Sequence, residues 1–355
     1  MQKNTPQLKV NIREIARLAN VSVATVSRTL KNEPTSKVSA EKQKQIRDLC
    51  GQLKYYPNEH TRRLFSGNAN TVAFFFPDFR GVRQGGFLDS YTYIDLNFGS
   101  CLIGAQSVLQ SREIDLLMTA ITPEFLETKR YLKLIRGKLL DGILLWGALD
   151  NAEYVNEVLS EGIPTVMVQT VKTNCQCSSV VADDYDGMRQ LTEKVLSNGH
   201  RKIAIVGSKG LASSWRNRLK GVTETLHKHG IARAYITEPG ELGHDSGRAA
   251  AQEILRNAPD VTCIMALSDT MAYGCIEILK EHNISVPEDM SVTGADGLHL
   301  PGNAIRLDTF FHPSYEIGKR GAELLLDEIS GNREIRNYCL PVENITGSTL
   351  TKARI

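Results

Sequence analysis

The chain has 355 residues, of which 41% are hydrophobic and 23% are charged, and its formal net charge is +2. This length exceeds one ordinary core and favours two or three domains, while the composition excludes an intrinsically disordered chain. No apolar run reaches the roughly eighteen residues of a membrane span, and the N-terminal segment lacks the apolar core of a signal peptide, so we expect a cytoplasmic protein.

The seven cysteines do not suggest a metal site. Only Cys175 and Cys177 lie close together, and neither a second pair nor a nearby histidine completes a ligand set. We therefore predict reduced, mostly buried thiols, and neither a metal nor a cofactor.

The charge is unevenly distributed. Residues 1–67 hold thirteen lysines and arginines against five acids, a net charge of +8, and the other residues hold 29 bases against 35 acids. A basic head on an acidic body is typical of nucleic-acid binding, although a solvated basic face is the alternative.

Three short helices are predicted in this basic segment. Asn11 caps the first, with Glu14 at capping-box spacing, and Asn20 ends it because asparagine tolerates a left-handed backbone. Ser22 and Ser39 cap the second and third helices. The inward apolar residues are Ile12, Ile15, Ala16, Ala19, Val26, Leu30, Ile46, Leu49, Cys50 and Leu53. Two short helices joined by a tight turn match a helix-turn-helix unit.

The second helix leaves a set of small residues and one arginine outside this core: Ser22, Val23, Ala24, Thr25, Ser27 and Arg28. Small side chains let a helix enter a major groove about 12 Å wide. The hydroxyls can donate to phosphates or bases, Arg28 can reach guanine or phosphate, and the valine and alanine suit a thymine methyl. An ordinary amphipathic helix would not explain so many exposed small residues.

The stretch EHTRRLFSG (59–67) predicts at most two helical turns closed by glycine. A helix of this length is not stable alone, so we expect its partner to order it.

From Thr71 onward, apolar strands alternate with helices. Strands are predicted at 71–78, 114–120, 141–146, 163–170, 202–207, 263–269 and 290–296, and helices near 100–111, 124–136, 151–161, 184–198, 216–229, 245–257, 271–282 and 314–329. This alternation predicts doubly wound parallel sheets that bind ligands at the carboxyl ends of their strands. Two halves, near 71–170 and 171–300, with a late crossover to the first, would form a hinged clamshell.

No enzyme motif is present: the sequence lacks G-x-G-x-x-G after the first strand, a phosphate loop, G-x-S-x-G and H-E-x-x-H. His200 lies in the loop NGHRK before a strand, where a polar turn residue is favoured over a catalytic base.

The chain resembles the LacI/GalR family of bacterial transcription regulators from about residue 9 to 350. The motifs are NIREIARLANVSVATVSRTLKN (11–32), VSAEKQKQI (38–46), LKYYPN (53–58), RRLFSG (62–67), DGILLW (141–146), NGHRKIAIVG (198–207), RNRLKGV (216–222), ALSDTMAYG (266–274) and PEDMSVTGAD (287–296). The resemblance implies an all-α helix-turn-helix headpiece (1–57), a hinge helix and linker (58–70), and an α/β periplasmic-binding-protein-like effector-binding and dimerisation body (71–350). The body has two doubly wound parallel-sheet subdomains: an N-subdomain of about 71–170 plus a crossover near 305–330, and a C-subdomain of about 171–300 plus the C-terminal segment.

The resemblance also implies a homodimer with two headpieces on a pseudo-palindromic DNA operator. Val23 and Ala24 become the variable specificity pair. The remaining DNA contacts are Ser22, Thr25, Ser27, Arg28, Asn32, Tyr55, Asn58 and Arg62. Leu64 matches the leucine of the family's hinge helix, which wedges open the minor groove at a central, usually CG, step. Burial of Leu64 between hinge and core is the alternative.

For the effector, the resemblance implies Arg218 and Asp296 as the strongest ligand positions, since an arginine opposite a carboxylate suits the vicinal hydroxyls of a sugar. Phe98 matches an aromatic stacking position, and Gln169, Ser268 and Asp269 fall near the cleft. Each of these could instead be a structural cap or core residue.

Three features depart from the family pattern. The stretch FRGVRQGGFLDSYTYI (79–94) is an insertion beside the expected cleft mouth, Asn20 replaces a frequent glycine, and no heptad tail follows Leu350, so we expect a dimer rather than a tetramer. We therefore predict a repressor that is controlled by a carbohydrate-like effector. A purine or phosphorylated corepressor, a sugar receptor without DNA function, and an enzyme on the same scaffold are the alternatives.

Overall fold

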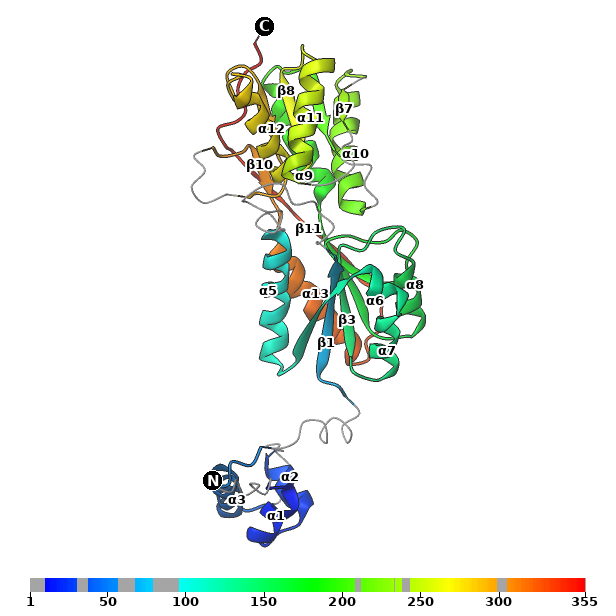
Figure 1. The fold of residues 1–355 in the computed structure, drawn as a ribbon, viewed down its shortest axis with the longest axis vertical. Helices are drawn as coiled ribbons and strands as arrows, with labels where there is room; N and C mark the ends of the chain where they lie inside the picture. Colours follow the sequence, from blue (N-terminus) through cyan, green and yellow to red (C-terminus); the bar gives the residue numbers. More distant parts are fainter. Residues whose placement is uncertain are drawn as a thin grey trace, which may run out of the picture. The chain divides into compact units, whose positions relative to one another are not determined.

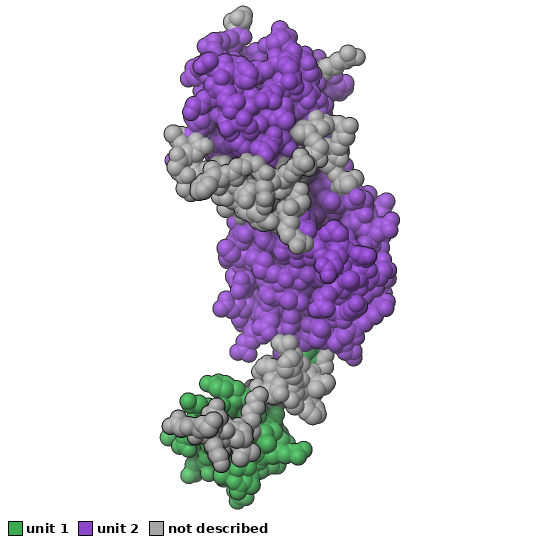
Figure 2. Space-filling view, in the orientation of Figure 1, with its two compact units in different colours: residues 1–68 green, residues 69–355 purple. Residues whose placement is uncertain are grey.

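The computed structural model describes residues 10–30, 38–56, 68–78, 96–207, 212–232, 234–237, 243–298 and 305–354. The chain divides into two compact units, Met1–Asn68 and Ala69–Ile355, which are green and purple in Figure 2. Within the described ranges, no helix is long and apolar enough to cross a membrane.

The first unit contains the three predicted helices, α1 (Ile12–Leu18), α2 (Val23–Leu30) and α3 (Ala40–Gln52). The side chains of Asn11, Ser22 and Ser39 accept the predicted capping bonds, and Asn20 has a left-handed φ of 52°. Six predicted core residues are buried: Ile15, Ala16, Ala19, Val26, Ile46 and Cys50. Ile12, Leu30, Leu49 and Leu53 pack against them while partly exposed, so the predicted mini-core is confirmed.

The second unit contains two parallel sheets and a small antiparallel ladder. The first sheet has the strand order β11-β5-β4-β3-β1-β2, and its strands β11, β3 and β1 are labelled in Figure 1. Its strands are β1 (Thr71–Pro77), β2 (Asp115–Ile121), β3 (Gly142–Trp146), β4 (Thr165–Val168), β5 (Ser178–Ala182) and β11 (Asn337–Leu340). Its helices are α5 (Leu96–Ser111), α6 (Pro123–Glu127), α7 (Arg130–Arg136), α8 (Glu153–Ser160) and α13 (Ser314–Ile329).

The central strands β1, β3 and β4 are buried on both faces, since their successive side chains point to opposite helical layers. Val72 and Phe74 join one apolar cluster with α5 and α13, whereas Ala73 and Phe75 join another with α6, α7 and α8. The helices α5 and α13 approach closely: a Cβ at Gly318 would lie 1.8 Å from a carbonyl oxygen of α5. Glycine is therefore required at that crossing.

The second sheet has the order β7-β6-β8-β9, and it repeats the same layering. Its strands are β6 (Ile203–Val206), β7 (Tyr235–Thr237), β8 (Cys263–Ala266) and β9 (Ser291–Thr293). The helices α9 (Asp184–Ser197) and α10 (Ser213–Lys228) join one cluster, and α11 (His244–Asn257) and α12 (Asp269–Glu281) the other. The antiparallel ladder pairs β10 (Thr309–Phe311) with β12 (Glu343–Ile345).

The structure corrects several sequence-based details. The helix predicted at 124–136 is two helices, because Lys129 between them adopts a left-handed φ of 46°. The strands β5, β7, β10, β11 and β12 were not predicted, since each is short and none shows a clear apolar run. Both β5 and β11 lie in the first sheet, so the expected subdomain boundary near residue 170 falls between two strands of one sheet. We refer below to the first sheet with its helices as the N-subdomain, and to the second with the ladder as the C-subdomain.

Candidate DNA-binding surface and ligand cleft

The outer face of α2 carries the predicted DNA contacts. Ser22, Ala24 and Arg28 are exposed, Val23 is 40% exposed, and Thr25 is half-buried. The hydroxyl of Ser22 caps the helix by accepting the Thr25 N–H at 3.1 Å and lies 2.9 Å from the Thr25 hydroxyl. The start of α2 is thus fixed by its own serine, while the side chains that follow remain available to a partner.

Tyr55 follows α3, and its ring packs against the headpiece core, where burial raises the pKa of its hydroxyl. The other predicted contacts, Asn32, Asn58, Arg62 and Leu64, lie outside the described residues, as does the insertion 79–94. The contacts proposed for all of these side chains stay predictions.

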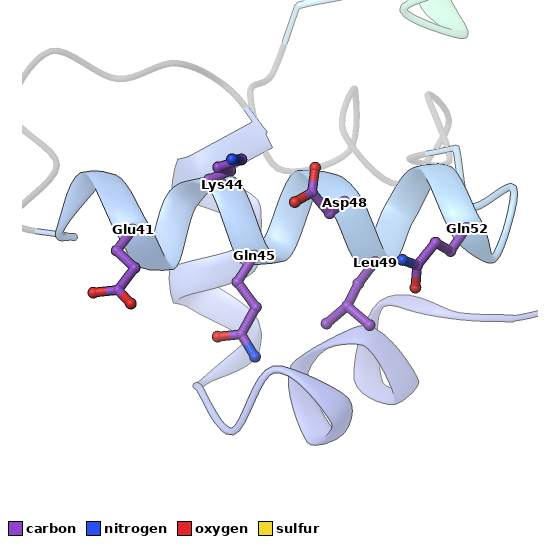
Figure 3. A pocket seen from close by; sticks show the side chains of 6 residues that line it. All are labelled: Glu41, Lys44, Gln45, Asp48, Leu49 and Gln52. Atoms are coloured by element: carbon purple, nitrogen blue, oxygen red, sulfur yellow. The ribbon is translucent and has the colours of Figure 1, made fainter.

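A shallow depression lies along α3, lined by Glu41, Lys44, Gln45, Asp48, Leu49 and Gln52 (Figure 3). All six residues come from successive turns of one helix, and their charges have both signs. Ligand sites need polar groups that converge from several elements, so we assign this depression no ligand.

In the second unit, Arg218 of α10 lies at the centre of a buried ionic cluster. Its Nε donates to Asp184 at 2.7 Å, and its Nη1 lies 2.8 Å from Asp296 and donates to the Leu267 carbonyl at 2.8 Å. The side chains of Arg218 and Asp184 are 4% and 1% exposed, and that of Asp296 is 10% exposed. The predicted pair Arg218 and Asp296 is therefore brought together, within direct contact.

Asp269 lies next to this cluster, and its backbone N–H donates to the Asp296 carboxylate at 3.3 Å. Its carboxylate accepts the Leu298 N–H at 2.6 Å and the Thr309 hydroxyl at 2.8 Å. Gly294 is required there, because a Cβ would lie 2.0 Å from the Asp269 oxygen. Ser268 caps α12 through its hydroxyl oxygen, which accepts a backbone N–H of the first turn at 3.3 Å. Ser268 and Asp269 therefore have structural roles here, and their contact with an effector remains a prediction.

Burial changes the ionisation of this cluster. It raises the pKa of Asp184 to about 6, against the opposing effect of Arg218. It raises the pKa of Asp269 to about 7, and the negative charge of Asp296 adds to that rise. Two carboxylates, Asp184 and Asp296, thus share one guanidinium, and a third, Asp269, lies next to Asp296, in a place that water does not screen.

Gln169 follows β4 at the carboxyl end of the first sheet and is 8% exposed. Its Nε2 lies 3.1 Å from His312 Nε2, and His312 Nδ1 lies 2.8 Å from the Ser314 hydroxyl. That hydroxyl donates to Asn97 Oδ1 at 2.9 Å, and Asn97 also hydrogen-bonds the Asp296 carboxylate. A continuous polar chain therefore joins the two subdomains.

The backbone is strained at both ends of this chain. Gln169 has a φ of 75° and Asp296 a φ of 146°, values that residues other than glycine rarely adopt. Such strain persists where surrounding contacts enforce it, and it concentrates at functional sites.

Phe98 lies in an aromatic group at the same end of the first sheet. Its ring centroid is 5.8 Å from that of Phe74, 4.9 Å from that of Phe76 and 5.3 Å from that of Trp146. Phe98 thus packs into the core cluster directly after Asn97 on α5, and its stacking on a ligand stays a prediction.

A second set of contacts joins the subdomains, and it includes an exposed ion pair. Arg216 of α10 forms an ion pair with Asp150, which follows β3, and donates to the Thr173 hydroxyl at 3.3 Å. The Val171 N–H donates to the Ser213 hydroxyl at 2.9 Å. The side chain of Arg216 is 42% exposed, so this contact faces solvent where the Arg218 cluster does not.

His200 is structural, as the sequence favours. It is 1% exposed, its ring nitrogens lie 2.9 Å from the Thr262 hydroxyl and the Thr351 carbonyl, and burial lowers its pKa. The seven cysteines, all within the described residues, form no disulfide, and five of them are buried. In the part of the chain that the structure describes, no three histidine, cysteine or acidic side chains gather as a metal site.

Sequence reasoning missed four members of the buried polar network between the subdomains: Asn97, Asp184, His312 and Ser314. Asp184 begins α9 two residues after the end of β5, so recognition of that strand would have placed it at a carboxyl end. The other three carry no local signal, because only the crossovers between subdomains bring them together.

Comparison with known proteins agrees with this architecture. Residues 11–58 match the description "Bacterial regulatory proteins, lacI family", and residues 192–350 match "Periplasmic binding protein-like domain". The HTH-type transcriptional regulator DegA of Bacillus subtilis (strain 168) is 29% identical over 88% of this chain and 89% of its own. Catabolite control protein A of Priestia megaterium is 27% identical over 90% and 92%.

Among solved structures, the lac repressor dimer bound to operator and an anti-inducer superposes with a TM-score of 0.83 at 20% identity, covering 96% of this chain and 99% of that one. A helix-turn-helix headpiece and a two-sheet ligand-binding body together define a DNA-binding transcriptional regulator rather than an enzyme. The chain belongs to the LacI family of bacterial regulatory proteins.

Proposed function

We propose that this regulator is a repressor that binds a pseudo-palindromic operator as a homodimer in the cytoplasm, and that a small carbohydrate-like ligand in the cleft controls its DNA affinity. The observation that carries the DNA half is the α2 surface, where small hydroxyl and methyl groups and Arg28 stand outside the mini-core. Such a helix fits the major groove, and the basic head supplies attraction to phosphate.

The proposal of an effector is supported by the polar groups that lie between the subdomains. Arg218, Asp296 and Gln169 converge from both subdomains beside aromatic rings, an arrangement suited to hydroxyl groups and sugar faces. A structure of the regulator CelR in complex with cellobiose shares this fold, with a TM-score of 0.69 over 96% of this chain at 24% identity. A ligand that prefers one subdomain arrangement must change operator affinity by the same coupling free energy.

The dimer is supported by an exposed apolar patch on the N-subdomain. Ile103 on α5 is 61% exposed, Met118 on the edge strand β2 is 47% exposed, and Tyr315 on α13 is 41% exposed. The helix α5 packs against both α13 and β2, and Met118 lies on the α5 face of β2 in register with Phe74. These exposed apolar groups therefore lie on one side of the N-subdomain, where a second copy can cover them.

Selection of bound duplexes from a random DNA pool by the full-length protein tests the proposal. A pseudo-palindrome with a central CG step is the expected result, and it would support the dimer, the headpiece and the insertion of Leu64 together. Recovery of no motif, with or without added sugars and purines, would contradict it. Titration of the selected operator complex with those ligands then shows whether a ligand weakens DNA binding, as for an induced repressor, or strengthens it.

A further inference from the structure

The polar chain that joins the subdomains has a defined direction. Asp296 is paired with Arg218 and only accepts hydrogen bonds, so the Asn97 group that meets it is the Nδ2 amide. The Asn97 oxygen then faces Ser314, whose hydroxyl must donate to it. A hydroxyl has one proton, so Ser314 can only accept from its other neighbour, His312 Nδ1–H.

This direction also determines which groups donate and accept at the Gln169 end of the polar chain. Because the proton of neutral His312 is on Nδ1, its Nε2 is a bare acceptor, and Gln169 must offer its Nε2 amide there at 3.1 Å. Burial lowers the pKa of His312 to about 3, aided by the charge of Arg218, which agrees with a neutral ring. The amide oxygen of Gln169 is left over, buried and without a partner among the described residues.

A buried acceptor without a donor destabilises the protein unless a ligand supplies the donor. The strained backbone at Gln169 strengthens the case that this oxygen is held in place for a ligand rather than left unpaired by chance. The polar chain leads from this oxygen to Asp296, and acidic groups outnumber bases at that end. Arg218 is the one described base in contact with Asp184 and Asp296, and the Asp269 N–H donates to the Asp296 carboxylate. An added anion would be repelled there, whereas hydroxyl or amino groups would find acceptors.

We propose that the effector carries no negative charge and donates a hydrogen bond, from a hydroxyl or amino group, to the side-chain oxygen of Gln169. The proposal rests on the effector control proposed above and deepens it: among the alternatives, it favours sugars, amino sugars and neutral purine bases over sugar phosphates, sugar acids and nucleotides.

The first test measures binding to the full-length protein without DNA, by thermal shift and calorimetry. The probes are matched sets: neutral mono- and disaccharides, their amino counterparts, neutral purine bases, sugar phosphates, sugar acids and nucleotides. Stabilisation by a neutral or amino probe, with at least tenfold weaker binding of its phosphorylated or acidic counterpart, is the expected result. Tighter binding of the anionic counterpart, or stabilisation by no neutral or amino probe, would overturn the proposal.

A double-mutant cycle then tests the hydrogen bond itself. In Gln169→Met, which keeps the side-chain length, affinity for the best probe should fall by about 10- to 100-fold. One analogue of that probe, lacking a single hydroxyl or amino group, should bind wild type about as weakly as the complete probe binds the variant. The affinity of this analogue should not fall further in the variant. Additive losses for every analogue would overturn the assignment of Gln169.

The matched control is Gln252→Met, the same chemical change on the exposed face of α11, which should leave affinity unchanged. Retained operator binding shows that Gln169→Met is folded. Because ligand binding is measured without DNA, a failure of operator recognition contradicts the proposed function alone, while a reversed charge preference contradicts only this inference.

Discussion

The two functional regions use polar side chains in opposite ways. On α2, hydroxyls and Arg28 are exposed and little of the headpiece core depends on them. In the cleft, Arg218, Asp184 and Asp269 are almost completely buried and hold one another in place. The exposed residues of α2 can therefore vary at little cost in stability, whereas a change in the buried cluster alters folding as well as any ligand binding.

The largest expected effect is that of the substitution Arg218→Met. Removing the guanidinium leaves Asp184 and Asp296 buried without their counter-charge, and breaking such a pair costs about 3–5 kcal/mol. We expect the free energy of unfolding, measured by urea titration, to fall by that amount. The control is Arg216→Met, two residues earlier on α10, where the exposed side chain predicts a loss below about 1 kcal/mol. Equal losses in the two variants would contradict the contrast.

The second prediction concerns pH and Asp269. Its pKa rises from an ordinary 3.8 to about 7 on folding, so the protonated form contributes stability that is present at acid pH and lost as pH rises through about 7. Asp269→Asn removes this dependence and can still accept from Leu298 N–H and donate to Thr309. Relative to wild type, we expect the variant to gain stability between pH 4 and pH 8, by up to about 1.4 kcal/mol per pH unit.

Urea titrations of both proteins at several pH values measure this difference. Asp245→Asn, which neutralises an exposed carboxylate on α11, is the control and should show no comparable trend. A difference between Asp269→Asn and wild type that stays constant across the pH range would show that Asp269 is ionised throughout.

On the headpiece side, Arg28→Ala should weaken operator binding about 10- to 100-fold if the arginine reads a base. A contact to phosphate would instead reduce the slope of log affinity against log salt by about one. The thermal midpoint should not change, because the side chain is exposed. Lys44→Ala removes the same charge from the exposed face of α3 and should leave sequence discrimination unchanged. If Arg28→Ala lowered the thermal midpoint as well as operator affinity, the weaker binding would reflect a damaged headpiece fold rather than a lost DNA contact.

Much of the fold was predictable, because it depends on local patterns. The caps at Asn11 and Ser39 and the apolar stripes of the headpiece are set by residues within a few positions of each other. The long buried strands β1 and β3 are continuous apolar runs, and they are where the sequence predicts them. The short strands β5 and β11 were missed, since a partly polar strand is defined by its neighbours in the sheet rather than by its own residues.

The candidate site was predictable only in part, for the same reason. Arg218 and Asp296 followed from the family resemblance, and the structure brings them together. Their buried partner Asp184 and the chain through His312, Ser314 and Asn97 depend on residues up to 217 positions apart in sequence. No sequence period records such contacts, because the crossovers between subdomains create them.

The smallest predicted effect concerns the exposed contact between subdomains. Arg216 and Asp150 form an ion pair whose side chains are 42% and 28% exposed, so solvent weakens their attraction. In a cycle of Arg216→Gln and Asp150→Asn, we expect a coupling free energy below about 1 kcal/mol that shrinks further at high salt. A coupling above about 3 kcal/mol, unchanged by salt, would mean that this pair is as buried as the Arg218 cluster. Since the two arginines lie on the same helix, α10, the measurement also shows how sharply solvent exposure changes across the face of the cleft.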